Sequence, residues 1–270
     1  MSEFSMNNGV ISAVISEHAA EMHSLKRLDS GIEYLWQGDP AFWAGRNPTL
    51  FPMVGSTWNK EVHLKGNVYH MGNHGFTRNS EFTCIEHDGS HIAMELCDSP
   101  ETLAQYPYRF RLVNTYTIKD NTLTVNCRLE NRNDETMPFN FGFHPAFNVP
   151  IGPNGDKQHT VIRFDQPELV NGTETTVLEL EPEALAKTII LTNPKSSTYT
   201  LTDGNHSLTV TAPGFPWCAF WSPHAPFVCI EPWHSHTDFD KAEVPFEERE
   251  GTVLLGPGEV FETGYRITVV

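Results

Sequence analysis

The sequence has no long hydrophobic run and little positive charge. No segment approaches the roughly 20 consecutive apolar residues that a membrane-spanning helix needs. Lysine and arginine number 18 against 34 acidic residues, which gives a formal net charge of −16. Because such a surface repels nucleic acid and anionic lipid, we expect neither as a partner. The N-terminus has no basic stretch ahead of an apolar segment, as a secretion signal would, and this favours a cytoplasmic location.

Cysteine is scarce and lacks the spacing of a metal or disulfide motif. The five cysteines include no CxxC pair, and each lies in an apolar or alternating stretch: Cys84, Cys97, Cys127, Cys218 and Cys229. This pattern predicts buried, reduced thiols with a structural role rather than a disulfide framework or a zinc site.

Long helical patterns are missing as well. Only 100–107 and 182–188 have a helical pattern, while 19 glycines and 19 prolines interrupt the chain. Alternation with a period of two dominates instead, as in TLTVNCRLE, where one face carries Leu123, Val125, Cys127 and Leu129. Turn signals separate such stretches, and no linker divides the chain. We therefore predict an all-β fold of antiparallel strands in stacked sheets, with residues 1–270 as a single domain.

Three segments contain groups that can move protons. NFGFHPAFN places His144 among phenylalanines, where desolvation lowers the pKa of an imidazole, although a core histidine has the same pattern. FVCIEPW puts Glu231 on the apolar face of a strand, where a carboxylate is costly unless it is paired or functional. HGFTR holds His74 in a loop whose glycine lets the backbone approach a ligand, although a loop histidine is more often only solvated. Without a neighbouring nucleophile, these groups favour proton transfer on a neutral polar substrate.

Arginines and tryptophans near these segments are candidates for binding a sugar. Trp36, Trp43 and Arg46 precede the apolar run PTLFPMVGS, and Arg78 ends HGFTR. Aromatic faces pack against sugar rings, and the forked guanidinium group binds oxygen atoms. Core aromatics and a surface salt bridge have the same composition, so the residues alone leave both interpretations open.

Two histidine pairs have spacings that occur in metal sites. His70 and His74 are four residues apart, but the glycines around them argue against the helix that would bring them together. His234 and His236 form an HxH pair, and the carboxylates after it lack the spacing of a cupin-like site. We therefore expect no metal site.

Four segments, taken in order, resemble the aldose 1-epimerase (galactose mutarotase) superfamily, and in particular its LacX-like bacterial branch. They are GIEYLWQGDPAFWAGRNPTLFPMVGS, HGFTR, FHPAFN and CIEPW, and the similarity extends from about Val10 to the C-terminus. The resemblance implies a galactose mutarotase-like antiparallel β-supersandwich. It also implies a cofactor-free isomerase that interconverts sugar anomers, as a monomer or a homodimer.

The resemblance also implies roles for individual residues. His144 would be the general acid and Glu231 the general base, while His74 would hydrogen-bond the substrate. Arg46 and Arg78 would be sugar-binding groups.

An aspartate that the family uses, between the second histidine and the glutamate, has no clear counterpart. Asp203 is a poor candidate because it lies in an Asp-Gly turn. The net charge and the few cations near HGFTR favour a neutral hexose, because a phosphate site usually gathers two or more cations. The alternatives are a hexose-6-phosphate 1-epimerase and a non-catalytic sugar-binding or sensor protein of the same fold.

Overall fold

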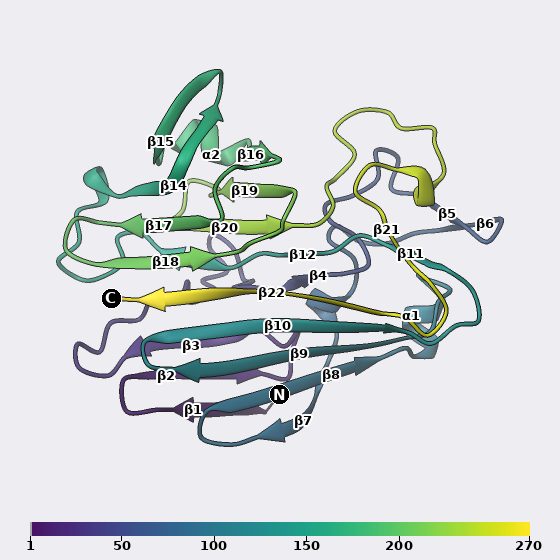
Figure 1. Cartoon of the computed structure of the whole chain (residues 1–270), viewed down its shortest axis with the longest axis horizontal. Coiled ribbons are helices and arrows are strands. Elements are labelled where there is room, and N and C mark those ends of the chain that lie inside the picture. Colours follow the sequence, from purple (N-terminus) through teal and green to yellow (C-terminus); the bar gives the residue numbers. More distant parts are fainter. Residues whose placement is uncertain (1) are drawn as a thin grey trace.

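The computed structural model describes residues 2–270 and is built almost entirely of β-sheet (Figure 1). The nine-stranded sheet has the order β15 (Thr173–Glu179), β14 (Val161–Val170), β17 (Thr198–Thr202), β18 (Ser207–Thr211), β22 (Val260–Val269), β10 (Thr122–Asn131), β9 (Phe110–Lys119), β8 (His91–Cys97) and β7 (Thr83–His87). The six-stranded sheet has the order β16 (Ile189–Thr192), β19 (Trp217–Trp221), β20 (Phe227–Trp233), β12 (Gly142–Phe143) and β4 (Thr49–Leu50), with β13 (Ala146–Asn148) also paired to β20.

Three smaller sheets complete the fold. They are the three-stranded β1 (Glu3–Asn7), β2 (Ile11–Ser16) and β3 (Met22–Arg27), and the pairs β5 (Val62–Leu64) with β6 (Asn67–Tyr69) and β11 (Met137–Phe139) with β21 (Val253–Leu255). All pairs of named strands are antiparallel. The predicted all-β class and sandwich architecture are confirmed.

Alternating hydrophobicity explains how the sheets pack. On β10 the four residues that the sequence places on one face, Leu123, Val125, Cys127 and Leu129, are all buried. Successive side chains of a strand point to opposite faces, so this face joins the core while the other meets solvent or a covering layer. Figure 1 shows β22, β10, β9 and β8 side by side in the lower half of the molecule.

Helices are few and short. The two α-helices are α1 (Pro100–Leu103) and α2 (Pro182–Ala186), and both fall within the stretches predicted to be helical. Three 3₁₀ turns are η1 (Thr77–Asn79), η2 (Lys157–His159) and η3 (Phe246–Glu248). Among residues 2–270, no helix has the length and hydrophobicity that crossing a membrane requires.

The cysteines only partly match the prediction. All five are free, and Cys127, Cys218 and Cys229 are buried. Cys84 and Cys97 are partly exposed, so the expectation of burial was wrong for these two. Cys84 lies on β7 and Cys97 on β8, the two strands at one edge of the nine-stranded sheet.

One glycine joins the HGFTR segment to the core. Gly75 forms a bridge with Phe51, whose carbonyl oxygen also accepts from the N–H of Phe76 at 3.2 Å. Its φ is +71°, a conformation that L side chains rarely adopt, and a Cβ there would collide with the Phe51 carbonyl. This contact fixes the loop that carries His74.

We predict that Gly75→Ala destabilises the protein more than Gly66→Ala does. Both positions have positive φ, which costs about 1–2 kcal/mol for alanine, but a Cβ at Gly66 meets nothing within 4 Å. The steric clash at Gly75 adds about 1–3 kcal/mol. Urea unfolding of the two variants measures the difference in the free energy of unfolding. Equal values would show that the backbone at Phe51 can move away from the new Cβ without loss of stability.

Candidate active site

A cavity of about 420 Å³ lies over β20 and contains most of the residues predicted to form a site. Its lining comes from the 43–55 and 73–78 segments, the chain just after β12, the turn after α2, strands β16, β19 and β20, and the segment that follows β20. The lining residues are Trp43, Gly55, Asn73, His74, Arg78, His144, Lys187, Thr188, Ile190, Trp221, Glu231, Trp233, Thr237 and Phe239.

Glu231 and His144 meet inside this cavity. Glu231 lies on β20, which is buried along its whole length, and only 1% of the residue is exposed. The chain after β12 runs beside β20, where the N–H of Ile230 donates to the carbonyl of Pro145 at 3.1 Å. This pairing brings Nε2 of His144 to 3.2 Å from Oε2 of Glu231. The contact lacks hydrogen-bond alignment, so Oε2 of Glu231 has no hydrogen-bond partner.

Burial shifts the pKa values of the two groups in opposite directions. It raises the pKa of the Glu231 carboxyl well above its ordinary value of 4.5. It also lowers the pKa of His144 well below 6.5, and the nearby His74 and Arg78 lower it further. Burial therefore favours the neutral forms of both groups, a protonated carboxyl beside a neutral imidazole, over an ion pair.

His74 presents a hydrogen-bond donor to the cavity. The backbone N–H of Gly55 donates to Nδ1 of His74 at 3.0 Å, so the proton of the neutral ring resides on Nε2. Burial, with a smaller contribution from Arg78, lowers the pKa of His74 to about 4, so the ring is neutral at pH 7. The residue has a φ of +65°, which is uncommon outside glycine and typical of functional sites.

Aromatic rings enclose the His144 imidazole. The ring of Trp43 lies 4.9 Å from that of His144 at an interplanar angle of 33°, and Trp221 meets it edge-on at 5.7 Å. Trp36 does not line the cavity. It is 6% exposed, packs on Phe227 at 4.6 Å and donates from Nε1 to the carbonyl of Trp43 at 2.8 Å. Because the chain turns between the two tryptophans, only Trp43 reaches the cavity, and Trp36 supports it from behind.

The two candidate arginines differ in whether they line the cavity. Arg78 lines the cavity, whereas Arg46 does not. The backbone N–H of Arg46 donates to Glu21 at 2.8 Å, and its guanidinium lies against Gly38. The carbonyl of Arg46 accepts from the N–H of Ala146 at 3.0 Å, so this residue supports the chain just after His144 instead of facing the cavity.

Several lining residues carry no signal for a site in the sequence. Lys187 and Thr188 end the stretch predicted to be helical, and Phe239 lies after the HxH pair. Only the pairing of β16, β19 and β20 brings Lys187 and Thr188 to the same cavity as Glu231. Trp233 lies within the CIEPW segment, but its indole was not singled out. Its Nε1 is buried without a hydrogen-bond partner.

Asp203 lies outside the cavity and has a structural role. Its carboxylate is 1% exposed and accepts hydrogen bonds from the backbone N–H groups of Ile151 at 3.0 Å and His206 at 2.7 Å. These bonds satisfy the buried carboxylate and join two turns, so it is not available to a ligand in the cavity.

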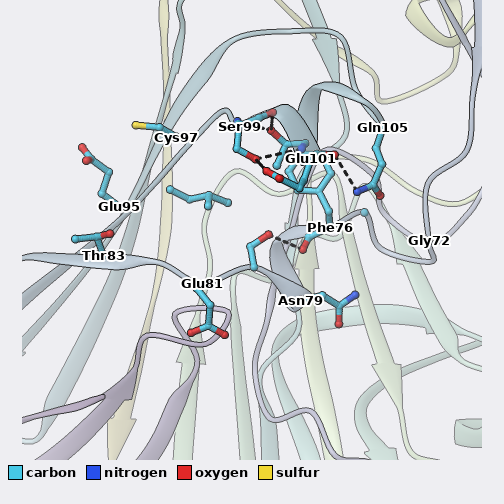
Figure 2. A pocket seen from close by; sticks show the side chains of 14 residues that line it. Gly72, Phe76, Asn79, Glu81, Thr83, Glu95, Cys97, Ser99, Glu101 and Gln105 are labelled. Carbon is cyan, nitrogen blue, oxygen red and sulfur yellow. Dashed lines mark hydrogen bonds between the residues drawn. The ribbon is translucent and has the colours of Figure 1, made fainter. Parts of the chain in front are cut away.

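A second cavity, of about 620 Å³, lies on the other side of the 72–80 segment (Figure 2). Three carboxylates line it, but each has a partner: Glu81 contacts His18 at 2.6 Å, Glu95 contacts Arg111 at 2.5 Å and Glu101 accepts from Ser99 at 2.8 Å. Figure 2 shows these three glutamates on separate parts of the wall. The larger cavity thus lacks the unpaired groups that distinguish the smaller one.

The comparisons with known proteins agree with the resemblance in the sequence. The model of the family described as aldose 1-epimerase matches residues 2–255. The chain belongs to the aldose 1-epimerase family. Protein LacX (chromosomal) of Lactococcus lactis subsp. lactis is 27% identical, with 98% of each chain covered.

Two solved structures have folds very similar to that of this chain. One is a galactose mutarotase related enzyme from Lactobacillus acidophilus, with a TM-score of 0.91, 29% identity, and coverage of 100% of this chain and 97% of that one. The other is a galactose mutarotase-like protein from Lactobacillus casei, with a TM-score of 0.91, 27% identity and full coverage of both chains.

The HxH pair does not assemble a set of metal ligands. His234 contacts Thr263 at 2.7 Å, while His236 contacts the carbonyl of Thr237 at 2.7 Å. Within residues 2–270, only one group of three side chains has its potential ligand atoms within 4.8 Å of one another, and it consists of His144, Cys229 and Glu231. Burial raises the pKa of the Cys229 thiol well above its ordinary value of 9.0.

We predict that Glu231→Gln raises the melting temperature at pH 7. Burial raises the folded-state pKa of the carboxyl, whereas the unfolded chain ionises it near pH 4.5. Its stabilising contribution is therefore complete below pH 4.5 and is lost as pH rises toward the folded pKa. The gap between variant and wild type should widen from pH 4.5 to pH 8 in thermal scans. Glu174→Gln, at an exposed carboxylate, serves as the control, and a lower melting temperature for Glu231→Gln at pH 7 would contradict the prediction.

Proposed function

We propose that this chain is an aldose 1-epimerase that interconverts the α and β anomers of a hexose without a cofactor. One observation carries the proposal: Glu231 Oε2, His144 Nδ1 and Trp233 Nε1 are buried without hydrogen-bond partners, and all three residues line one cavity. Buried polar atoms are nearly always paired in folded proteins. The hydroxyl groups and ring oxygen of a sugar supply the acceptors and donors that these atoms lack.

The chemistry needs one proton donor and one proton acceptor. The acid protonates the ring oxygen, the base removes the proton of the C1 hydroxyl, and the bond between C1 and the ring oxygen breaks to give the open-chain aldehyde. Rotation about C1–C2 and closure in the reverse sense give the other anomer. The two groups exchange roles on closure, so the single proton of the Glu231–His144 pair suffices for both directions.

The resting proton has to move before His144 can act as the acid. When the cavity fills, sugar hydroxyls can hydrogen-bond to the Glu231 carboxyl and add to the lowering of its pKa that the neighbouring Trp233 side chain already causes. These bonds favour its ionised form and return its pKa toward the ordinary range. The two atoms lie only 3.2 Å apart, so a small reorientation that aligns them as a hydrogen bond would let the proton pass from Glu231 to His144. Glu231 then serves as the base, and His144 as the acid.

The remaining residues orient the sugar. The Nε2–H of His74 and the guanidinium of Arg78 donate to sugar oxygens, and the Trp43 ring provides a face for the C–H groups of the pyranose. Spontaneous mutarotation is already fairly quick, so positioning together with acid–base assistance accounts for useful catalysis.

An NMR measurement of anomer exchange tests the proposal. Freshly dissolved α-glucose and α-galactose are followed with and without the protein, and we expect approach to the anomeric equilibrium to accelerate in proportion to protein concentration. Sugar binding without acceleration would instead support a sensor of the same fold.

We predict that Glu231→Gln and His144→Asn each lower the rate of catalysed exchange by about 10²–10⁴-fold, because each removes one of the two proton-transfer groups. Glutamine matches glutamate in size and asparagine is a smaller polar replacement for histidine, so circular dichroism should show an intact fold in both variants. Near wild-type exchange in either variant would eliminate that residue from the mechanism.

His234→Gln provides the matched histidine control. This ring lies outside the cavity and bonds to Thr263, so its replacement should leave exchange close to the wild-type rate. A metal site built on the HxH pair predicts the reverse order, with His234→Gln inactive and wild-type activity sensitive to a chelator.

A further inference from the structure

Two cationic side chains line the candidate active site from different sides. Arg78 lies in η1, which packs near β4 at one edge of the six-stranded sheet, and its charge lowers the pKa values of His74 and His144. Lys187 lies between α2 and β16, at the opposite edge of the same sheet. Arg78 is thus beside the proton-transfer groups, while Lys187 occupies the far end of the cavity.

Neither cation is neutralised by the protein. Within residues 2–270, no carboxylate oxygen lies within 4.0 Å of the charged nitrogens of Arg78 or Lys187. Glu183, four residues before Lys187 on α2, has the spacing of a helical ion pair but contacts His224 at 3.9 Å instead. Glu231 is the one carboxyl group of the lining, and burial raises its pKa, which favours its uncharged form. The cavity thus holds two unpaired cations in a protein whose net charge is −16.

The backbone holds the Lys187 corner in a defined shape. The N–H of Lys187 donates to the carbonyl of Ala184 at 3.2 Å, and that of Thr188 donates to Leu185 at 3.0 Å. Thr188 has a φ of +65°, a conformation that is a genuine outlier for a β-branched residue. Such strain persists where the surrounding structure enforces it, and it clusters at ligand sites.

Strand spacing sets the length of the cavity. Because β19 separates β16 from β20, the two strands lie about 10 Å apart at about 4.8 Å per step. A hexose that has C1 at Glu231 and His144 and lies across β19 would bring its other end to the β16 side of the cavity, where Lys187 is.

We propose that the cavity takes a sugar with an anionic group, a phosphate or a carboxylate, on the carbon farthest from C1, and that Lys187 binds this group. The inference rests on the proposed function and names its substrate class. The anionic sugar replaces the neutral hexose that the sequence favoured. In the sequence, Lys187 lies far from the four family motifs, so it gave no reason to expect a cation in the site. The acidic surface opposes such a substrate at long range, and the unpaired cations of the cavity offset that repulsion locally.

Anomer exchange on glucose, glucose 6-phosphate and glucuronate tests the proposal. For the wild-type protein we expect kcat/KM on at least one anionic sugar to exceed that on glucose by about tenfold or more, as charge-assisted hydrogen bonds allow. The anionic sugar that is preferred identifies the group as a phosphate or a carboxylate. Added salt should reduce the preference.

Variants of Lys187 assign the effect to this residue. Lys187→Met should lower the ratio of kcat/KM on the preferred anionic sugar to that on glucose by about tenfold, mainly through KM, and Lys187→Arg should restore much of it. Lys195→Met is the control, because Lys195 is an exposed lysine outside the cavity that pairs with Glu174 at 3.6 Å. Its ratio should equal that of the wild type.

Two results would overturn the inference while leaving the proposed function intact. One is exchange of glucose at least as efficient as that of both anionic sugars, and the other is a Lys187→Met ratio equal to that of the wild type. If no sugar exchanges, the proposed function fails, and calorimetric titration with glucose 6-phosphate and glucuronate tests the site directly. Binding that Lys187→Met abolishes would support the anionic site, and absence of binding would refute it.

Discussion

The contact between the Glu231 carboxyl and the His144 imidazole is the constraint on which the rest of the site depends. Both groups are buried away from water that could stabilise a charge, and Oε2 of Glu231 and Nδ1 of His144 have no hydrogen-bond partner. Holding them 3.2 Å apart requires that two chain segments pair closely. Strand β20 provides this rigidity because it is hydrogen-bonded on one side to β19 and on the other to β12 and β13.

The same arrangement costs stability. Burial shifts the pKa values of Glu231 and the two histidines away from their values in water, and each shift costs stability at a pH where the unfolded group would change its charge. The left-handed backbone at His74 costs stability as well. A continuous core that extends from Met6 to Val269 offsets these costs, with many phenylalanines among its fully buried side chains. Trp36, in a smaller buried cluster with Phe227, and Arg46, through its backbone hydrogen bonds, support the chain next to a cavity that neither lines.

Individual residues show how far sequence reasoning extends into the site. Glu231 was identifiable because its neighbours two positions apart are apolar, and His144 because phenylalanines surround it in the chain. Both signals are local, and both report burial directly. Trp36 and Trp43 have no such distinction, because a turn between them decides which one faces the cavity. Lys187 carries no local signal, since a lysine after a short helix is ordinarily solvated and only its place in the fold makes it part of a cavity.

The sequence by itself determined the all-β class, the two short helices and the burial of the strands, because period-two hydrophobicity and turn residues act over a few positions. It also determined the family, because four motifs in order are specific even where each alone is weak. Only the tertiary structure decided which residues share the cavity, the tautomer of His74, the unpaired state of the buried Glu231 oxygen and the charge of the cavity wall. These properties depend on distances between segments far apart in the chain, and strand order and register set those distances.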